Sequence, residues 1–178
     1  MPTCGRPYRA RLRGEGATRL VGISWKSVNP EFGRSKSQAL ADWREILRVP
    51  GARFIDLQYG DTARERSRIA QGSGARIEHL PDLDLHDDLE GLAALCAACD
   101  LVITASNVTA HVAGALGRPV WLTAPQGGGR LWYWFSGRAD SPWYPSMRIF
   151  NQLVSGSWRE TLDAVARELR AYCSSLAS

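Results

Sequence analysis

The sequence is poor in lysine and has no long apolar run, and each shortage excludes a class of protein. Lys26 and Lys36 are the two lysines among 22 basic residues. No apolar run reaches the roughly 20 residues that a membrane-spanning helix needs, and the first residues lack the apolar core of a signal peptide. We therefore expect a cytoplasmic protein without a membrane span.

Cysteine and histidine are too sparse to indicate a disulfide framework or a metal site. Cys96 and Cys99, two of the four cysteines, have the spacing of a redox motif or of half a zinc site, but no second pair completes such a site. We expect them at the carboxyl end of a helix, where the dipole raises a thiol pKa, and interpret them as small buried apolar side chains. The three histidines show no metal-ligand spacing, so we expect no metal and no other cofactor.

Two common phosphate-binding motifs are also missing. The first apolar run, Leu20–Trp25, is not followed by G-x-G-x-x-G, and G-x-x-x-x-G-K-[ST] occurs nowhere, which argues against a dinucleotide-binding fingerprint and a P-loop. A net charge of +4 mildly favours anionic partners. Because the basic residues are scattered, apart from the stretch Arg6–Arg13, we expect no nucleic-acid partner.

Six short apolar runs alternate with segments of helical spacing. The predicted strands are Leu20–Trp25, Arg53–Gln58, Ile77–Leu80, Leu101–Thr104, Val120–Thr123 and Met147–Phe150, and the predicted helices are Gln38–Arg48, Thr62–Gln71, Leu89–Ala98, Val108–Leu116 and Ser157–Tyr172. The predicted helix caps are Ser37, Thr62 with Glu65, Asp87 with Glu90, Ser106 or Asn107, and Ser157 with Glu160. This alternation predicts an α/β fold, a doubly wound, Rossmann-like parallel sheet of about six strands with helices on both faces. We expect one domain over residues 19–178, preceded by a linker or terminal arm over residues 1–18.

The stretch Asp100–Pro119 is typical of a βαβ crossover, so its two strands are predicted to be parallel neighbours. Ser106 and Asn107 are good caps for the helix that begins at Val108. The first turn of that helix offers free backbone N–H groups and the positive end of its dipole, which suits a phosphate or diphosphate. The same pattern also fits a plain crossover helix with a polar cap.

Small residues on one side of this helix predict that its backbone lies close to the sheet. They are Ala110, Ala113, Gly114 and Gly117. Gly117 also stands where a helix needs a left-handed terminator.

The common strand order 3-2-1-4-5-6 would bring the two lysines to the central helix. In that order, the loop after the first strand and the start of the central helix face each other across one crevice. The loop, residues 25–36, holds Lys26 and Lys36. Lysine is a good point-charge partner for phosphate, so we expect both near an anion bound at the central helix.

Four stretches, Val21–Trp25, Phe54–Asp61, Asp100–Pro119 and Asp140–Arg148, together resemble one known family. They resemble the carboxyl-terminal, donor-binding half of GT-B glycosyltransferases, in the heptosyltransferase-like group and its tetratricopeptide-linked relatives, over residues 19–172. The resemblance implies the donor half of an inverting, metal-independent glycosyltransferase. The implied partners are a nucleotide sugar or nucleotide diphosphate and an acceptor-binding domain that this chain lacks, and exposed aromatic residues would allow a homo-oligomer.

The resemblance also implies a set of binding residues. The diphosphate would lie against the start of the central helix, at Ser106, Asn107, Val108, Thr109 and His111. Lys26 or, by preference, Lys36 would steady the same group. Gln58 and Asp61 would approach the ribose, and the loop near Leu80 would line the base. The catalytic base is unknown, because the acceptor half usually supplies it.

Other interpretations stay open. Heptosyltransferases typically carry Asp-Thr-Gly where this chain has Ser106-Asn107-Val108, a form closer to the tetratricopeptide-linked branch. A non-catalytic nucleotide- or anion-binding module with the same half fold is the alternative function. Simpler roles are open for single residues: packing or capping for His111, a cap for Asp61, loop core or a docking surface for Trp132, Trp134, Trp143 and Tyr144, and a solvated loop for Asp82, Asp84, Asp87 and Asp88.

Overall fold

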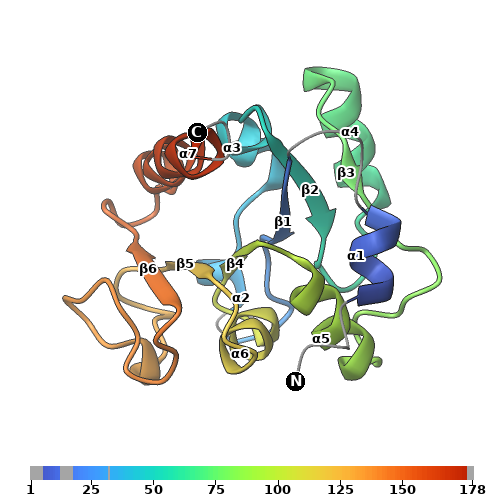
Figure 1. Cartoon of the computed structure of the whole chain (residues 1–178). Helices are drawn as coiled ribbons and strands as arrows, with labels where there is room; N and C mark the ends of the chain where they lie inside the picture. The colour runs from blue at the N-terminus through green and yellow to red at the C-terminus, as the bar shows by residue number, and fades with distance from the viewer. Residues whose placement is uncertain (1–5, 13–17, 32, 176–178) are drawn as a thin grey trace.

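A computed structural model describes residues 6–12, 18–31 and 33–175, which form one sheet with helices on both faces (Figure 1). The strands are β1 Arg19–Ser24, β2 Ala52–Asp56, β3 Ile77–Glu78, β4 Leu101–Ala105, β5 Val120–Ala124 and β6 Met147–Asn151. All five pairings are parallel, and the order is β3-β2-β1-β4-β5-β6. The predicted fold class and strand order are confirmed.

Two apolar clusters hold the helices against the sheet. The helices are α1 Arg6–Leu12, α2 Gly33–Lys36, α3 Arg44–Leu47, α4 Ala63–Ser73, α5 Leu89–Ala98, α6 Val108–Ala115 and α7 Arg159–Ser174, with 3-10 turns η1 Leu40–Trp43 and η2 Trp132–Trp134. Side chains of η1, α3, α4 and α7 pack on one face, and those of α1, α5 and α6 pack on the other. Every residue of β4 is buried, as a central strand covered on both faces requires. Within the described ranges, no helix is long and apolar enough to cross a membrane.

The segment before β2 differs from the prediction of a loop and then one long helix. Gly33–Lys36 forms the short helix α2, and the 3-10 turn η1 and α3 replace a continuous helix over 38–48. Ser37 does not cap a helix. Its hydroxyl donates to the Gly33 carbonyl and accepts from the Ser27 N–H, so it closes the loop onto itself.

Three other helix starts also differ from the prediction. Helix α7 begins after Trp158, which is its N-cap residue and forms no side-chain capping hydrogen bond, so Ser157 is not the cap. Thr62 forms no capping hydrogen bond, because its hydroxyl donates to the buried Asp56 carboxylate at 2.6 Å. Its expected partner Glu65 instead accepts from the Trp25 indole N–H at 3.0 Å. The cap of α5 is Asp88 rather than Asp87, and Asp88 accepts from the Gly91 N–H at 2.7 Å.

The small residues of α6 have two separate roles. Gly117 has φ +66° and ends the helix, as predicted. Gly114, however, gives room to a loop and not to the sheet: a Cβ atom there would lie 2.6 Å from the Tyr144 ring. Ala110 and Ala113 are fully buried in the cluster beneath the helix.

The cysteine pair and the first helix complete the fold. Cys96 and Cys99 are fully buried, and burial raises the pKa of the Cys96 thiol to about 12, so the prediction of small apolar side chains is confirmed. Helix α1 lies in the segment expected to be a linker or arm. Its Arg9 pairs with Asp100 at 2.6 Å, and Leu12 is buried against the domain. The rest of that segment lies outside the described residues, and the boundary at residue 19 stays a prediction.

Candidate functional site

Asn107 joins the start of α6 to the loop after β1. Strands β1 and β4 are neighbours in register, with Ser24 opposite Thr104, so both segments leave the sheet at the same edge. The Asn107 side-chain amide donates to the Ser24 hydroxyl at 2.7 Å and to the Lys26 carbonyl at 3.1 Å. Its carbonyl oxygen accepts from the Thr109 N–H at 3.0 Å, which caps α6. One side chain therefore fixes both walls of the predicted crevice.

This cap reduces the number of free N–H groups at the start of α6. The Asn107 N–H donates to the Ala105 carbonyl at 2.8 Å, and the Thr109 N–H is used by the cap. The Val108 N–H has no acceptor within the described part of the chain. The Thr109 hydroxyl is buried and also lacks a partner there. The turn thus leaves one backbone N–H and one buried hydroxyl without a partner in the described part of the chain, fewer free donors than the sequence suggested.

Lys36 supplies an uncompensated positive charge to the same edge. The residue is 4% exposed, and burial, with no carboxylate opposing it, lowers the pKa of its ammonium group. No ion pair involves Lys36 among residues 6–12, 18–31 and 33–175. Its charge acts on His111, since it contributes to the lowered pKa of that imidazole. Lys36 therefore lies close enough to α6 for its charge to influence His111.

Lys26 differs from Lys36, because its charge is already paired. Its ammonium group forms an ion pair with Glu65 in the first turn of α4. Glu65 also accepts from the Trp25 indole, so the pair is fixed from two sides. The structure thus distinguishes the two lysines that the sequence left as alternatives.

Gln58 and Asp61 have structural partners at the end of β2. The Gln58 side chain is buried, and its carbonyl oxygen accepts from the N–H groups of Trp25 and Lys26 at 3.0 and 2.9 Å, which shapes the loop after β1. Asp61 is exposed and accepts from the Ala63 N–H at 2.9 Å at the start of α4. Their contact with a ribose stays a prediction.

An aromatic cluster that the sequence did not assign to the site surrounds His111. The imidazole stacks on Trp134 with ring centroids 4.9 Å apart, and the ring edges of Tyr133 and Tyr144 also face it. Its Nδ1 lies 3.0 Å from the Tyr144 hydroxyl. The Trp134 indole donates to the buried Ser106 hydroxyl at 2.8 Å. The loop before β6 therefore supports the start of α6.

Burial and the nearby Lys36 lower the pKa of His111, in that order of size. The imidazole is therefore neutral at pH 7, because its ordinary pKa is already near 6.5. A neutral imidazole offers one N–H donor and one acceptor nitrogen.

A second cluster missed by the sequence lies around Asp56 at the end of β2. Its carboxylate accepts from the Thr62 hydroxyl and pairs with Arg66 at 3.1 Å, and Nδ1 of His79 lies 3.2 Å away. Burial is the largest influence and raises the pKa of Asp56. Its partners satisfy it within the fold, so it is a structural group near the predicted ribose end.

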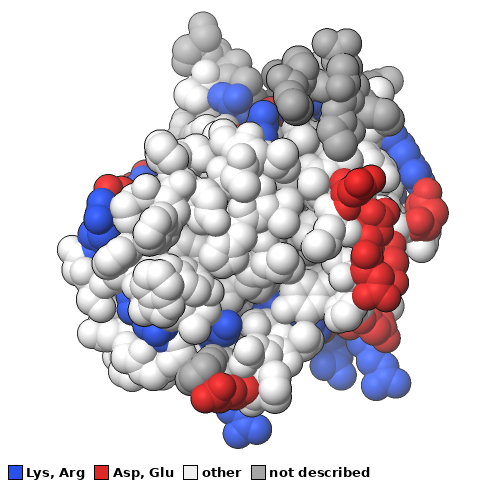
Figure 2. All heavy atoms as spheres, turned by 90° about the horizontal axis from the view of Figure 1, so that it is seen from below, with Lys and Arg blue, Asp and Glu red and all other residues white. Residues whose placement is uncertain are grey.

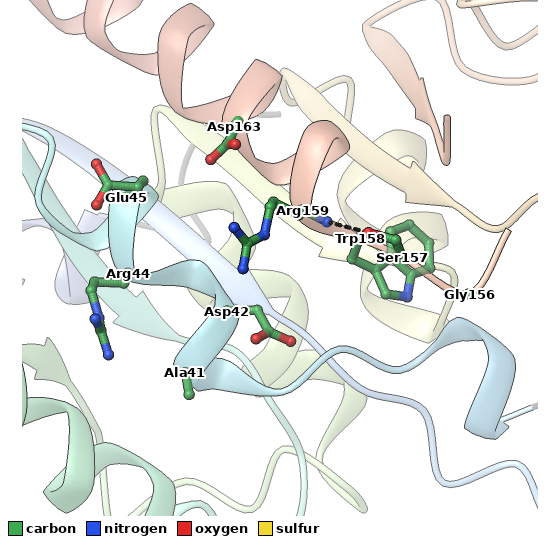
Figure 3. A pocket seen from close by; sticks show the side chains of 9 residues that line it. All are labelled: Ala41, Asp42, Arg44, Glu45, Gly156, Ser157, Trp158, Arg159 and Asp163. Carbon is green, nitrogen blue, oxygen red and sulfur yellow. Dashed lines mark hydrogen bonds between the residues drawn. The ribbon is translucent and has the colours of Figure 1, made fainter. Parts of the chain in front are cut away.

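A separate cavity lies between η1, α3 and the start of α7 (Figure 3). It has a volume of about 610 Å³. Its charged lining residues are Asp42, Glu45, Asp163, Arg44 and Arg159. Arg159 points from α7 toward η1 in Figure 3. Glu45 is paired with Arg48 and Arg170, so the remaining charges of the lining are two carboxylates and two guanidinium groups. The hollow therefore has no excess positive charge that would favour a diphosphate.

The surface over α5 and α6 has an uneven charge distribution. Figure 2 shows an acidic strip on the side where α1 and α5 lie, and an uncharged centre. The exposed acidic residues just before and within the first turn of α5 are Asp82, Asp84, Asp87, Asp88 and Glu90. Some of these carboxylates accept N–H groups of their own loop, as a cap-rich solvated segment would.

The comparisons with known proteins agree with this architecture. No protein-family model matches the chain. Protein FlbA of Caulobacter vibrioides is 38% identical over 170 residues, which cover 94% of this chain and 28% of FlbA. The structure of E. coli ADP-heptose LPS heptosyltransferase II matches with a TM-score of 0.69 at 16% identity, over 100% of this chain and 54% of that chain. E. coli heptosyltransferase WaaC, solved with ADP, matches with a TM-score of 0.55 at 16% identity, over 96% and 48%.

These matches define the class of fold. The chain has the fold of one half of a GT-B glycosyltransferase. It spans about half the length of these solved structures and less than a third of FlbA.

Proposed function

We propose that this chain is the donor-binding half of an inverting, metal-independent glycosyltransferase, with the diphosphate of a nucleotide sugar held between Lys36 and the start of α6. The observation that carries the proposal is Lys36, a residue only 4% exposed, which has no acidic partner in the described part of the chain and whose charge acts on His111. A positive charge on a largely buried side chain is unfavourable without a partner, so a bound anion would stabilise it. The fold shared with WaaC, which was solved with ADP, supports the same ligand class.

Each group at this edge would stabilise the leaving diphosphate in its own way. Lys36 would neutralise charge, and the Val108 N–H would donate a hydrogen bond to a phosphate oxygen. Charge on the diphosphate grows as the anomeric bond breaks, so these donors would act most strongly in the transition state.

The base that activates the acceptor would come from a separate acceptor-binding half. His111 is committed to the aromatic cluster and Asp61 to the start of α4. Trp132 and Trp143, which are 75% and 53% exposed, would form part of the surface that receives that half. A cytoplasmic location belongs to the same proposal.

The alternative is a non-catalytic module that binds a nucleotide or anion. It is favoured by one observation: the Asn107 cap uses the Thr109 N–H, which leaves few donors for a leaving group. Sugar transfer by the chain together with an acceptor half would exclude this alternative.

Calorimetry with ADP, GDP, UDP and CDP tests the proposal. We expect the wild type to bind at least one of them, and Lys36→Met to weaken that binding by about 1–3 kcal/mol, the scale of a charge-assisted hydrogen bond. Lys26→Met is the matched control and should weaken it less, because Glu65 already pairs with Lys26.

Thermal unfolding separates binding from folding. Lys36→Met removes an unpaired charge from a largely buried side chain, so the free variant should be at least as stable as the wild type. Equal affinities for the wild type and both variants would contradict the proposal.

A further inference from the structure

Tyr144 makes the one side-chain hydrogen bond recorded for His111 in the described part of the chain. Its hydroxyl lies 3.0 Å from Nδ1. The opposite nitrogen, Nε2, has no recorded partner among the described residues. Stacking on Trp134 and the edge of Tyr133 limit rotation of the imidazole, so the direction of Nε2 is fixed.

The position of Tyr144 is itself tightly specified. The Met147 N–H donates to the Tyr144 carbonyl at 2.9 Å, which ties the residue to the first residue of β6. The ring lies against Gly114 of α6, where any Cβ atom would come within 2.6 Å of it. A glycine in the middle of a helix costs stability, and here it makes room for this ring.

We propose that Tyr144 is a positioning residue that sets the proton arrangement of His111, so that Nε2–H is offered as a hydrogen-bond donor to a bound diphosphate. A phenol is a good donor and a neutral imidazole nitrogen a good acceptor, so the hydroxyl donates to Nδ1. The proton of the neutral ring then resides on Nε2. This inference rests on the proposed function, because the donor is useful only if an anion binds at this edge.

His111 could contact an anion although its lowered pKa keeps it neutral, because a neutral imidazole still has one N–H donor. An imidazolium would attract an anion more strongly, but burial and Lys36 oppose that form in the free protein. Lys36 would supply the positive charge, and the Nε2–H group would supply a directional hydrogen bond. The two residues would then bind one anion although only Lys36 is charged in the free protein.

The test uses Tyr144→Phe, with Tyr133→Phe as the matched control. Both substitutions remove one hydroxyl from the same aromatic cluster, and Tyr133 contacts His111 by its ring edge. The probe is inorganic pyrophosphate, measured by calorimetry at pH 7.5. We expect Tyr144→Phe to weaken binding about three- to tenfold, the scale of one hydrogen bond, and Tyr133→Phe to change it less than twofold.

Nitrogen-15 spectra of His111 give a readout that a merely structural role would not move. In the free wild type, we expect a proton on Nε2 and the chemical shift of a hydrogen-bonded acceptor at Nδ1, with that acceptor shift lost in Tyr144→Phe. Thermal unfolding of both variants shows whether each remains folded.

The outcomes separate this inference from the proposed function. A proton on Nδ1 in the wild type overturns the inference even if pyrophosphate binds, and so do equal affinities for the wild type and Tyr144→Phe. If the wild type shows Nε2–H but binds neither pyrophosphate nor a nucleoside diphosphate, the proposed function fails and the role toward a diphosphate fails with it.

Discussion

Two regions of this molecule compete as binding sites, and they differ in charge balance more than in size. The hollow beside α7 has a volume of about 610 Å³, but its exposed arginines share it with three carboxylates. The edge between the loop after β1 and the start of α6 contains a buried lysine with no recorded acidic partner in the described residues. We propose the second region as the anion site because of its unpaired positive charge and not because of its volume. Four predictions test this contrast.

Asn107→Ala should have the largest effect on stability. It removes the cap of α6 and leaves the hydroxyls of Ser24 and Thr104 with fewer partners. Loss of a cap and of buried hydrogen bonds together should reduce the free energy of unfolding by about 2–4 kcal/mol. Urea denaturation measures this. Asp42→Asn, in the hollow, is the control and should stay within about 0.5 kcal/mol of the wild type.

Gly114→Ala should destabilise the same region by about 1–3 kcal/mol, because the new methyl group must displace the Tyr144 ring. Gly72→Ala is the matched control, since Gly72 lies in α4 and nothing stands within 4 Å of its Cβ position. It should stabilise the protein by up to about 1 kcal/mol. Similar effects of the two substitutions would show that Tyr144 can move freely.

Arg159→Gln should leave nucleoside diphosphate affinity unchanged. Arg159 lines the hollow and points into it (Figure 3). Calorimetry of Arg159→Gln and Lys36→Met with the same nucleoside diphosphate compares the two regions directly. A loss in Arg159→Gln as large as that in Lys36→Met would move the site to the hollow.

The last prediction concerns the pH dependence of stability. The pKa of His111 is lowered in the folded chain, chiefly by burial, so the unfolded chain takes up a proton more readily. The stabilising effect of the neutral His111 imidazole is fully present above the pKa of histidine in the unfolded chain, near 6.5. It is lost as the pH falls through the lower pKa that His111 has in the folded chain. His111→Gln should therefore show a shallower loss of stability than the wild type as pH falls below 6.5. The free energy of unfolding is measured by urea denaturation at several pH values. An identical dependence of this free energy on pH in the wild type and the variant would contradict the prediction.

The fold was largely predictable because its signals are local. Buried strands such as Leu101–Ala105 are continuous apolar runs, and Gly117 marks the end of the helix that it directly follows. The strand order is the common one for folds in which strands and helices alternate. The cap at Asn107 was predictable for the same reason.

The site was only partly predictable because its decisive contacts join distant segments. Lys26 differs from Lys36 through Glu65, a residue 39 positions away. Tyr144 reaches His111 from 33 positions away, through a loop that has no periodic pattern. Thr62 failed as a cap because the buried Asp56 competed for its hydroxyl.

The most direct test of the account is a titration of the isotope-labelled chain with inorganic pyrophosphate, followed by backbone amide chemical shifts. The account predicts saturable shifts at Lys36, Val108 and Thr109, with the amides of Ser157–Asp163 beside the hollow unaffected. Shifts confined to Ser157–Asp163, or no saturable shift at Lys36 and Val108, would contradict the central claim that the diphosphate lies between the loop after β1 and the start of α6.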